Sequence, residues 1–459
     1  MRNSEENITF ANRNNKENRD HTTMIWNESR ECMSREQMRD LQSRRLRKMA
    51  EYVYHNTPFY RKKFQEMDLS PSDIKDIDDI VKLPFTDKFD LRDNYPFGLA
   101  AVPMSQIVRI QASSGTTGKP VVVLYTRKDL DDWAEVMSRA FYAYGATRED
   151  IFHVAYGYGL FTGAWGAHDG ATNIGASVIP MSAGNTQKQV TLMHDFGATV
   201  LCCTPSYAMY LGEAIRDSSY PKEDFKLRIG MFGAEPWTEN MRHKLEDLLG
   251  LKAYDMYGLS EMAGPGVGFE CECQHGTHLQ EDYFYPEIVD PKTGEPLPEG
   301  TMGELCFTHL AKEGMPLIRY RTHDLTALHY GKCACGRTTV RMEKIIGRCD
   351  DMLILRGVNV FPSQVEAVIL SLKEFEPHYL LTVGRENNTD TIELSVEVKE
   401  EYFTDELSQL VGLQKKLQAE LRSVIGLGFK IKLVEPKGIE RSTGKARRVI
   451  DNRRIGIDV

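Results

Sequence analysis

The sequence predicts an α/β protein with a large N-terminal unit of mixed sheets and helices and a smaller C-terminal α+β unit. Short apolar runs alternate with segments whose apolar residues recur at helical spacing, as in strands followed by helices. The composition changes near Asp350, where alternating strands replace the buried runs. A chain of 459 residues is too long for one simple core. We therefore predict an arm at residues 1–24, an N-terminal domain at 25–349 and a C-terminal domain at 350–459.

The elements of the N-terminal unit follow from the spacing of its apolar residues. Residues 1–24 are rich in Asn, Glu and Arg, so we expect a disordered or loosely attached arm. Two helical stripes are predicted, one before and one after a buried strand. The first stripe is Leu41, Leu46, Met49, Ala50 and Val53, the strand is Val121–Tyr125, and the second stripe is Leu130, Trp133, Met137, Ala140 and Phe141. Further strands are predicted at Ile151–Ala155, Thr199–Cys203 and Ile229–Phe232, and a helix at Met241–Leu249.

The C-terminal unit shows two strand patterns around one helical pattern. The first predicted strand has apolar residues at alternate positions, as in a half-buried strand. It comprises Ile392, Leu394, Val396 and Val398; the helical stripe comprises Phe403, Leu407, Leu410, Leu417, Leu421 and Val424; the second strand comprises Phe429, Ile431 and Leu433. These elements predict a separate α+β domain.

The composition excludes several classes of protein. A formal net charge of -9 is unlike that of a general nucleic-acid binder, which is usually basic. No apolar stretch approaches the length that crosses a membrane, and no secretory signal is visible at the N-terminus. The nine cysteines are odd in number and their spacing does not suggest disulfides. We therefore expect a soluble protein of the reducing cytoplasm.

A glycine-rich loop precedes the strand predicted at Val121–Tyr125. Its glycines let backbone N–H groups approach an anion, and its hydroxyls and ammonium add donors for phosphate oxygens. The spacing differs from that of a Walker A loop, and Pro120 follows the lysine. A flexible surface turn is the alternative that the residues alone leave open. The candidate phosphate-binding residues are Ser113, Ser114, Gly115, Thr116, Thr117, Gly118 and Lys119.

The glycine-rich loop and five further motifs, in this order, resemble the adenylate-forming enzymes, which include acyl-CoA synthetases, luciferases and peptide-synthetase adenylation domains. In that resemblance the loop binds phosphate. The other motifs correspond to an adenine-binding turn, an aromatic-Gly-x-Ser-Glu segment, a ribose-binding aspartate, a hinge and a catalytic-lysine loop. They are Gly233–Pro236, Tyr257–Glu261, Tyr320–Asp324, Gly347–Asp350 and Ser442–Lys445.

The segments between these motifs are similar to one branch of the superfamily, the phenylacetate-CoA ligases. The similar segments are Tyr156–Gly163, Cys202–Tyr207, Gly264–Gly266 and Arg356–Gln364, and the likeness runs from about Tyr54 to Asp451. The resemblance implies a large AMP- and acid-binding domain with a mobile C-terminal lid. It implies a ligase that converts an aryl acetate to its CoA thioester through an acyl-adenylate. ATP, Mg²⁺ and coenzyme A are the implied cofactors, and ligases of this branch are often homodimers.

The resemblance also assigns the nucleotide site. Asp324 would accept hydrogen bonds from the ribose hydroxyls, Arg348 would donate near the ribose or phosphate, and Tyr257 would stack on adenine. Simpler interpretations are a turn aspartate, a surface ion pair and a core aromatic. The further residues expected at the nucleotide are Gly233, Ala234, Glu235, Pro236, Asp255, Met256, Gly258 and Ser260.

Two side chains are the candidate catalytic residues. Glu261 is expected to hold Mg²⁺, which prefers one or two carboxylates together with phosphate oxygens. Lys445 is expected to cancel charge on the reacting carboxylate. It lies in a basic run with Arg441 and Arg448, and the ordinary interpretation of such a run is a solvated face. By resemblance, Asp350 is the hinge about which the lid rotates between the two half-reactions.

Aromatic residues and glycines alternate in Tyr156–Gly163 and suggest the acid pocket. The glycines would open space for a flat ring, with aromatic side chains as its walls. No basic residue lies in this segment, which favours an acid with an apolar tail. A glycine-rich strand end beside core aromatics is the alternative. The candidate acid-binding residues are Phe141, Tyr156, Tyr158, Gly159, Phe161, Gly163, Ala234 and Pro265.

Cysteines and histidines in two separated clusters suggest a structural zinc site. The preferred ligands are Cys271, His278, Cys333 and Cys335, with Cys273 or His275 as substitutes for one of them. Because the spacing is irregular, a group of reduced cysteines near a loop is the alternative interpretation.

Other functions fit the same motifs. One alternative is an adenylating enzyme that activates a benzoate- or indoleacetate-type acid. Another is an adenylating enzyme that uses an acceptor other than coenzyme A, as an amide-forming synthetase does. A non-catalytic nucleotide-binding protein is a third possibility, against which Lys445, Glu261 and Asp324 argue together. We expect a small aromatic acid, ATP and coenzyme A as partners, and neither nucleic acid nor a membrane.

Overall fold

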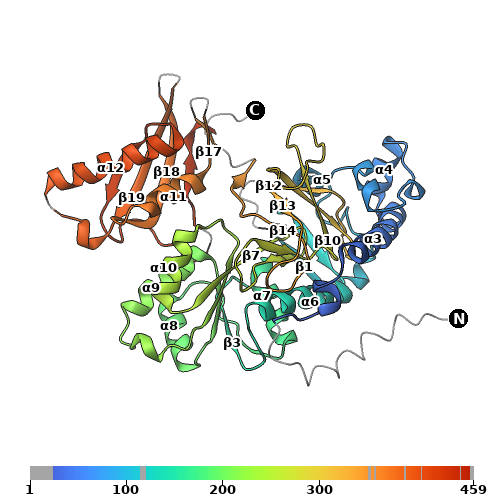
Figure 1. The fold of residues 1–459 in the computed structure, drawn as a ribbon, viewed down its shortest axis with the longest axis horizontal. Coiled ribbons are helices and arrows are strands. Elements are labelled where there is room, and N and C mark those ends of the chain that lie inside the picture. The colour runs from blue at the N-terminus through green and yellow to red at the C-terminus, as the bar shows by residue number, and fades with distance from the viewer. Residues whose placement is uncertain are drawn as a thin grey trace.

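The computed structural model describes residues 24–113, 120–349, 353–355, 358–386, 389–404, 406–444 and 446–454. The ribbon has a large N-terminal part and a smaller C-terminal part that sits against one end of it (Figure 1). Apart from Met24, the predicted arm lies outside the described residues. Within the described ranges, no helix combines the length and the apolar character that a membrane span requires.

Nine strands of the N-terminal part form one sheet. They are β3 (Ile151–Val154), β4 (Ser177–Ile179), β5 (Val200–Cys203), β6 (Ile229–Gly233), β7 (Lys252–Leu259), β8 (Gly264–Phe269), β9 (Thr277–Leu279), β13 (Leu328–His329) and β14 (Arg341–Met342). Their order is β13-β14-β9-β8-β7-β6-β5-β3-β4. The pairs from β4 to β7 are parallel, and β8, β9, β14 and β13 extend the sheet in antiparallel fashion. The runs predicted at Ile151, Thr199 and Ile229 are confirmed as the parallel strands β3, β5 and β6.

Helices cover both faces of this sheet. The helices are α6 (Arg127–Ala143), α7 (Thr162–Asn173), α8 (Thr186–Asp195), α9 (Pro205–Arg216) and α10 (Glu239–Leu249). In β5, Cys202 packs in the core formed by α6 and α7, whereas Cys203 packs in the core formed by α8, α9 and α10. Successive side chains of a strand point to opposite faces, so both are buried and the strand is apolar throughout.

A second sheet and the N-terminal helices complete this part. The sheet is β10 (Phe284–Val289), β11 (Gly303–His309), β12 (Tyr320–Thr326) and β15 (Gly347–Arg348), all antiparallel, and β1 (Arg109–Ala112) pairs with β2 (Val122–Tyr125). The helices are α2 (Glu28–Glu31), α3 (Arg35–Asn56), α4 (Pro58–Glu66) and α5 (Lys88–Asp93). Helix α3 begins at a capping box of Ser34 and Gln37, and the apolar stripe predicted for it is buried.

The C-terminal part packs its own core. Its elements are β16 (Leu353–Leu355), β17 (Val358–Val360), α11 (Pro362–Ser371), β18 (Phe375–Glu386), β19 (Thr389–Val398), α12 (Leu407–Ile425), β20 (Lys430–Val434) and β21 (Val449–Asp451). The sheet order is β20-β19-β18-β21, and α11 and α12 contribute to the same buried cluster. Leu417 and Leu421 of the predicted stripe are fully buried. Phe403 precedes α12 and Val424 is 62% exposed, so the stripe is shorter than predicted.

Candidate active site

Two neighbouring parallel strands, β6 and β7, end at the candidate site. A Cβ on Gly233, at the end of β6, would lie 2.2 Å from the carbonyl oxygen of Met256 on β7. A Cβ on Gly258 would lie 2.0 Å from the carbonyl oxygen of Gly264. Only glycine fits at these two positions, because the neighbouring backbones approach too closely for a side chain. The turn that follows β6 places Ala234 in the left-handed region, at a φ of 70°.

The ends of these strands open into a cavity of about 210 Å³. In it, the Tyr257 hydroxyl donates to Asp324 Oδ2 at 2.7 Å, and Arg348 Nη1 lies 3.5 Å from Asp324 Oδ1. Asp324 and Arg348 are direct partners in the register of β12 and β15, which explains why residues distant in sequence meet. The predicted nucleotide residues that line the cavity are Ala234, Glu235, Pro236, Asp255, Met256, Tyr257, Gly258, Asp324 and Arg348.

Burial sets the protonation of two groups in this cavity. Burial and the Asp324 carboxylate raise the pKa of Tyr257 well above its ordinary value, so the hydroxyl stays protonated and donates. Burial and the nearby Glu270 carboxylate raise the pKa of Asp255 to about 6. Asp255 Oδ1 accepts a hydrogen bond from Trp237 Nε1 at 2.9 Å.

Sequence reasoning missed several side chains of the cavity. Trp237 directly follows the motif that ends at Pro236, so extending that motif by one residue would have found it. Lys344 and Ile345 precede the hinge motif by a few residues, and no pattern in the sequence singles them out. Met342 reaches the cavity because β14 pairs with β9, a register that the sequence does not reveal.

Glu261 lies in the turn that follows β7 and is 8% exposed. The next residue, Met262, offers its carbonyl oxygen to two buried side chains, His309 and Lys312. Among the ion pairs between described residues, none involves Glu261. The Glu261 carboxylate is therefore nearly buried and held in a fixed turn, and none of these ion pairs neutralises it. A carboxylate in this situation is suited to bind a metal cation.

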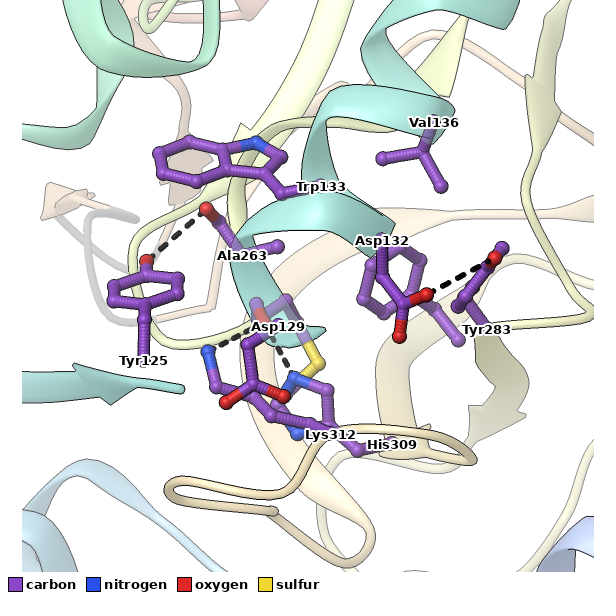
Figure 2. A pocket seen from close by; sticks show the side chains of 11 residues that line it. Tyr125, Asp129, Asp132, Trp133, Val136, Ala263, Tyr283, His309 and Lys312 are labelled. Carbon is purple, nitrogen blue, oxygen red and sulfur yellow. Dashed lines mark hydrogen bonds between the residues drawn. The ribbon is translucent and has the colours of Figure 1, made fainter. Parts of the chain in front are cut away.

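The glycine-rich loop lies between β1 and β2 in the sequence. Ser113 N donates to Val121 O at 2.9 Å and closes the base of the loop; Ser114 to Lys119 lie outside the described residues. At the far end of β2, the Tyr125 hydroxyl donates to Ala263 O at 3.1 Å (Figure 2). The strand that leaves the loop is therefore tied to the segment just after Glu261.

The predicted acid segment connects β3 to α7. A Cβ on Gly163 would lie 2.8 Å from the Phe161 ring and 3.4 Å from the Tyr156 ring, so these three residues are adjacent. A Cβ on Gly159 would meet no atom within 4 Å, which fits the expectation that this glycine leaves space. The Tyr158 hydroxyl lies 3.1 Å from His168 Nδ1 on α7.

The remaining two candidates, Pro265 and Phe141, lie against one face of α7. A Cβ on Gly166 would lie 2.6 Å from the Pro265 ring, and a Cβ on Gly170, about one turn further on, would lie 3.0 Å from the Phe141 ring. Phe141 is fully buried on α6 and packs its edge against Phe152, with ring centroids 4.7 Å apart. The structure therefore places Phe141 in the core between α6 and α7. In the same region Thr162 Oγ1 lies 3.1 Å from Ser260 Oγ and links the acid segment to the turn of Glu261.

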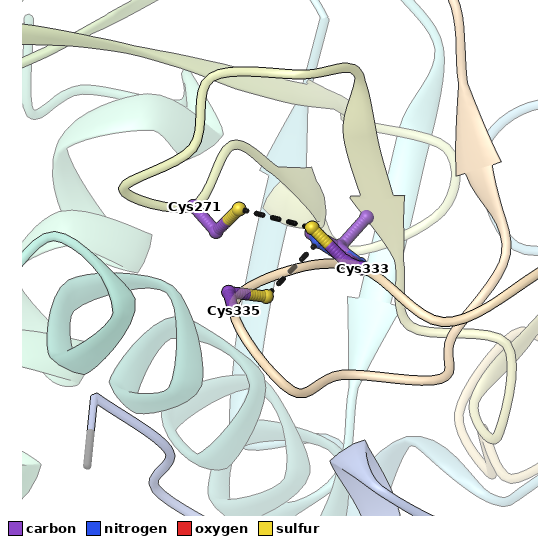
Figure 3. Close-up of side chains that lie close together, drawn as sticks. Cys271, Cys333 and Cys335 are labelled. Atoms are coloured by element: carbon purple, nitrogen blue, oxygen red, sulfur yellow. Dashed lines mark hydrogen bonds between the residues drawn. The ribbon is translucent and has the colours of Figure 1, made fainter.

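The four preferred zinc ligands lie together. One ligand atom from each of Cys271, His278, Cys333 and Cys335 falls within 4.8 Å of the others. Figure 3 shows the three thiols facing one another, with Cys271 Sγ and Cys333 Sγ 3.8 Å apart. His278 points Nε2 toward Cys335 Sγ at 3.6 Å and engages Thr339 Oγ1 through Nδ1 at 2.9 Å. Cys273 is exposed, and neither it nor His275 belongs to the cluster.

The loop that carries Lys445 is held against the N-terminal part. Lys445 itself, like the predicted hinge residue Asp350, lies outside the described residues. Thr204 Oγ1 donates to Gly444 O at 3.0 Å, and Ala446 N donates to Glu235 Oε2 at 3.0 Å. The residues on both sides of Lys445 therefore touch the N-terminal part. Glu235 was predicted at the nucleotide; it lines the cavity, and its carboxylate accepts a backbone N–H of this loop.

A second cavity, of about 650 Å³, lies between the two parts of the chain. It shares Glu235, Trp237 and Arg348 with the first cavity and is closed on the other side by Glu366 and Arg448 of the C-terminal part. Two neighbouring cavities that share lining residues, one of them holding a carboxylate beside an arginine, suit a nucleotide and a second substrate.

The fold and this site define an AMP-binding enzyme with a C-terminal domain. A family model described as AMP-binding enzyme matches residues 26–310, and one described as AMP-binding enzyme C-terminal domain matches residues 357–453. The chain is 48% identical to the phenylacetate-coenzyme A ligase of Thermus thermophilus, over 94% of this chain and 100% of that protein. The chain belongs to the family of phenylacetate-coenzyme A ligases.

The two parts of this chain are arranged as in one of two states of a solved relative. A 2-hydroxyisobutyryl-CoA ligase in the postadenylation state, in complex with R3-HIB-AMP, is 28% identical, with a TM-score of 0.89 over 95% of this chain and 96% of that one. In the thioesterfication state the same ligase, 29% identical over the same shares, has a TM-score of 0.70. The arrangement seen here is therefore close to that of the postadenylation state.

Proposed function

We propose that this chain joins phenylacetate to coenzyme A at the expense of ATP. A carboxylate oxygen of the acid attacks the α-phosphorus of ATP, and the bond to the bridging oxygen breaks, so that pyrophosphate leaves. The sulfur of coenzyme A then attacks the acyl carbon of the adenylate, the thiol loses its proton, and AMP leaves. The cavity that gathers Tyr257, Asp324 and Arg348 beside the lysine loop is the observation that carries this proposal.

The protein's residues divide this work. Asp324 accepts hydrogen bonds from the ribose hydroxyls, and the Tyr257 hydroxyl orients the Asp324 carboxylate. Arg348 supplies positive charge beside this carboxylate. Ser113 to Lys119 bind the phosphates, and Lys445 neutralises charge as the carboxylate approaches the α-phosphate. The residues from Tyr156 to Gly163, with Ala234 and Pro265, hold the aromatic acid, and the glycines leave room for its ring.

Glu261 is the residue that would hold Mg²⁺. Its nearly buried carboxylate and its place beside the strand that leaves the phosphate loop fit a hard cation that also takes phosphate oxygens. The ion would supply neutralisation of the phosphate charge. The chain's own contribution is to fix Glu261 through the Met262 carbonyl oxygen, which His309 and Lys312 hold.

The cluster of Cys271, His278, Cys333 and Cys335 would bind one structural zinc. Four soft donors within 4.8 Å of one another suit a tetrahedral site, and the Thr339 hydroxyl orients the imidazole. Metal analysis of the purified protein tests this: about one equivalent of zinc is expected, and less than about half an equivalent would count against the site.

We also propose the boundary between the two domains at residue 350 and a homodimer, as the resemblance to this branch implies, and a cytoplasmic location, which the number and spacing of the cysteines favour. Light scattering on the purified protein tests the dimer, and cell fractionation tests the location.

A panel of carboxylic acids tests the substrate. Purified protein is supplied with ATP, Mg²⁺ and coenzyme A, and AMP release is followed with phenylacetate, benzoate, indoleacetate and acetate. The highest kcat/KM is expected for phenylacetate. A clear preference for benzoate or indoleacetate would change the acid but keep the reaction, whereas no AMP release with any acid would contradict the enzyme.

A further inference from the structure

A buried ion-pair network joins α9 to the segment just before the lysine loop. The Arg441 guanidinium forms two hydrogen bonds to Glu397, at 2.6 Å and 3.0 Å, and a third to Glu213 Oε2 at 3.3 Å. Glu397 is fully buried, and the side chains of Arg441 and Glu213 are 12% and 13% exposed. Arg441 therefore is not part of a solvated basic face, which was the ordinary interpretation of this run.

Glu213 has a second partner from the C-terminal part of the chain. His378, on β18, places Nε2 at 3.2 Å from Glu213 Oε1. Burial disfavours the charged carboxylate, but His378 and Arg441 together hold the pKa of Glu213 below its ordinary value. The carboxylate is therefore ionised at neutral pH and attracts two groups of the C-terminal part.

The partners of Arg441 belong to different parts of the chain. Glu397 is on β19 and moves with Arg441 if the C-terminal part turns, whereas Glu213 stays with α9. The related 2-hydroxyisobutyryl-CoA ligase resembles this chain far less in its thioesterfication state than in its postadenylation state. The hydrogen bond that Arg441 donates to Glu213 would therefore break if the C-terminal part turned, whereas those that it donates to Glu397 would be kept.

The hydrogen bond between Arg441 and Glu213 lies close in sequence to the loop of Lys445 and restrains it. Arg441 is four residues ahead of Lys445, and within the stretch between them Gly444 O accepts a hydrogen bond from Thr204 Oγ1 of the N-terminal part. Because Glu397 also accepts the backbone N–H of Ile439 at 2.7 Å, fixing Arg441 fixes the start of the loop as well.

A nearby pair offers a contrast. Lys437 Nζ lies 2.8 Å from Asp217 at the end of the same helix, but their side chains are 66% and 45% exposed. An exposed pair of this kind contributes little, because water and salt screen it. It crosses between the same two parts of the chain and is therefore a matched control.

We propose that Glu213 is a positioning residue for the adenylation half-reaction: it holds Arg441 and so places the Lys445 loop over the nucleotide. This inference rests on the proposed function. It assigns to Glu213 no role in the second half-reaction, in which the C-terminal part has turned away.

The test separates the two half-reactions in Glu213→Gln. ATP–pyrophosphate exchange with phenylacetate measures adenylation, and thioester formation from prepared phenylacetyl-adenylate and coenzyme A measures the second step. Gln keeps the shape and leaves Arg441 paired with Glu397, so folding is expected to survive. Exchange is expected to fall about tenfold, because Arg441 loses one charged hydrogen-bond partner and keeps the other, while the second step changes by less than about twofold. Asp217→Asn should leave both rates within about twofold of the wild type.

A second variant keeps the test decisive if Glu213→Gln is unstable. Arg441→Lys retains the charge and one carboxylate partner but cannot bridge two, so the same selective loss is expected. Combined with Glu213→Gln it should add little further loss, since both remove the same bond. Equal loss of both half-reactions, or no loss of exchange in either variant, would overturn the inference. Absence of exchange in the wild type would instead refute the proposed function.

Discussion

His309 makes the stability of the N-terminal part depend on pH. Its ring is fully enclosed: Nδ1 accepts from Leu317 N at 2.9 Å, and Nε2 contacts the carbonyl oxygen of Met262. Because the acceptor at Nδ1 fixes the proton on Nε2, this environment suits the neutral ring. Burial and the neighbouring Lys312 ammonium lower the pKa of His309 to about 3, from 6.5.

The sign and size of the effect follow from linkage. Between pH 6.5 and 3 the unfolded chain binds a proton at this histidine and the folded chain does not. The contribution of His309 to the free energy of unfolding is therefore complete above pH 6.5 and is lost as the pH falls toward 3. The loss is about 1.4 kcal/mol per pH unit, or about 2 kcal/mol between pH 6.5 and 5.

Urea unfolding of the wild type and His309→Gln at pH 6.5 and pH 5 measures this loss. Gln can accept from Leu317 and donate to Met262 but does not titrate, so its free energy of unfolding should fall by about 2 kcal/mol less over the interval. The control is His329→Gln, since that side chain is 42% exposed. If the wild type and His309→Gln lose the same free energy over this interval, the enclosed neutral histidine is not the cause.

Three further substitutions address the proposed roles. Lys445→Ala should lower the rate of ATP–pyrophosphate exchange by roughly two to three orders of magnitude while the protein stays folded; an unchanged rate would remove Lys445 from the mechanism. Asp350→Pro should slow thioester formation more than adenylation, and equal losses in a folded variant would argue against a hinge there. Gly258→Ala should reduce the free energy of unfolding by about 1–3 kcal/mol, because its Cβ would meet the Gly264 backbone. Gly157→Ala, where a Cβ meets nothing within 4 Å, is its control, and equal effects would contradict the packing argument.

Local patterns predicted the elements better than their pairing. Apolar runs located β3, β5 and β6, and helical spacing located α3 and α6, because both patterns depend only on near neighbours. Periodicity extended the C-terminal stripe to Phe403 and Val424 because it cannot tell where a helix loses contact with its sheet. The pairing of β14 with β9, which brings Met342 to the cavity, joins segments far apart in sequence.

The same limit applies to the site. The motifs anticipated the meeting of Tyr257, Asp324 and Arg348, and the spacing of cysteines suggested the group of four ligands that the structure brings together. The environment of Arg441 was not predictable, because its carboxylate partners lie far from it in sequence, at positions 213 and 397. A run of basic residues looks the same in sequence whether its members face water or buried acids.

The left-handed turn at Ala234 has a consequence for how ligands meet this enzyme. A non-glycine residue seldom adopts a φ of 70°, and His323, beside Asp324, shares this conformation at 66°. Ala234 lies in the turn after β6 and His323 within β12, and the neighbouring strands hold both conformations, so these parts of the cavity wall are fixed by the sheets. The nucleotide site is thus pre-organised, so less of the binding free energy is spent on ordering the protein and more of it is left for the chemical step.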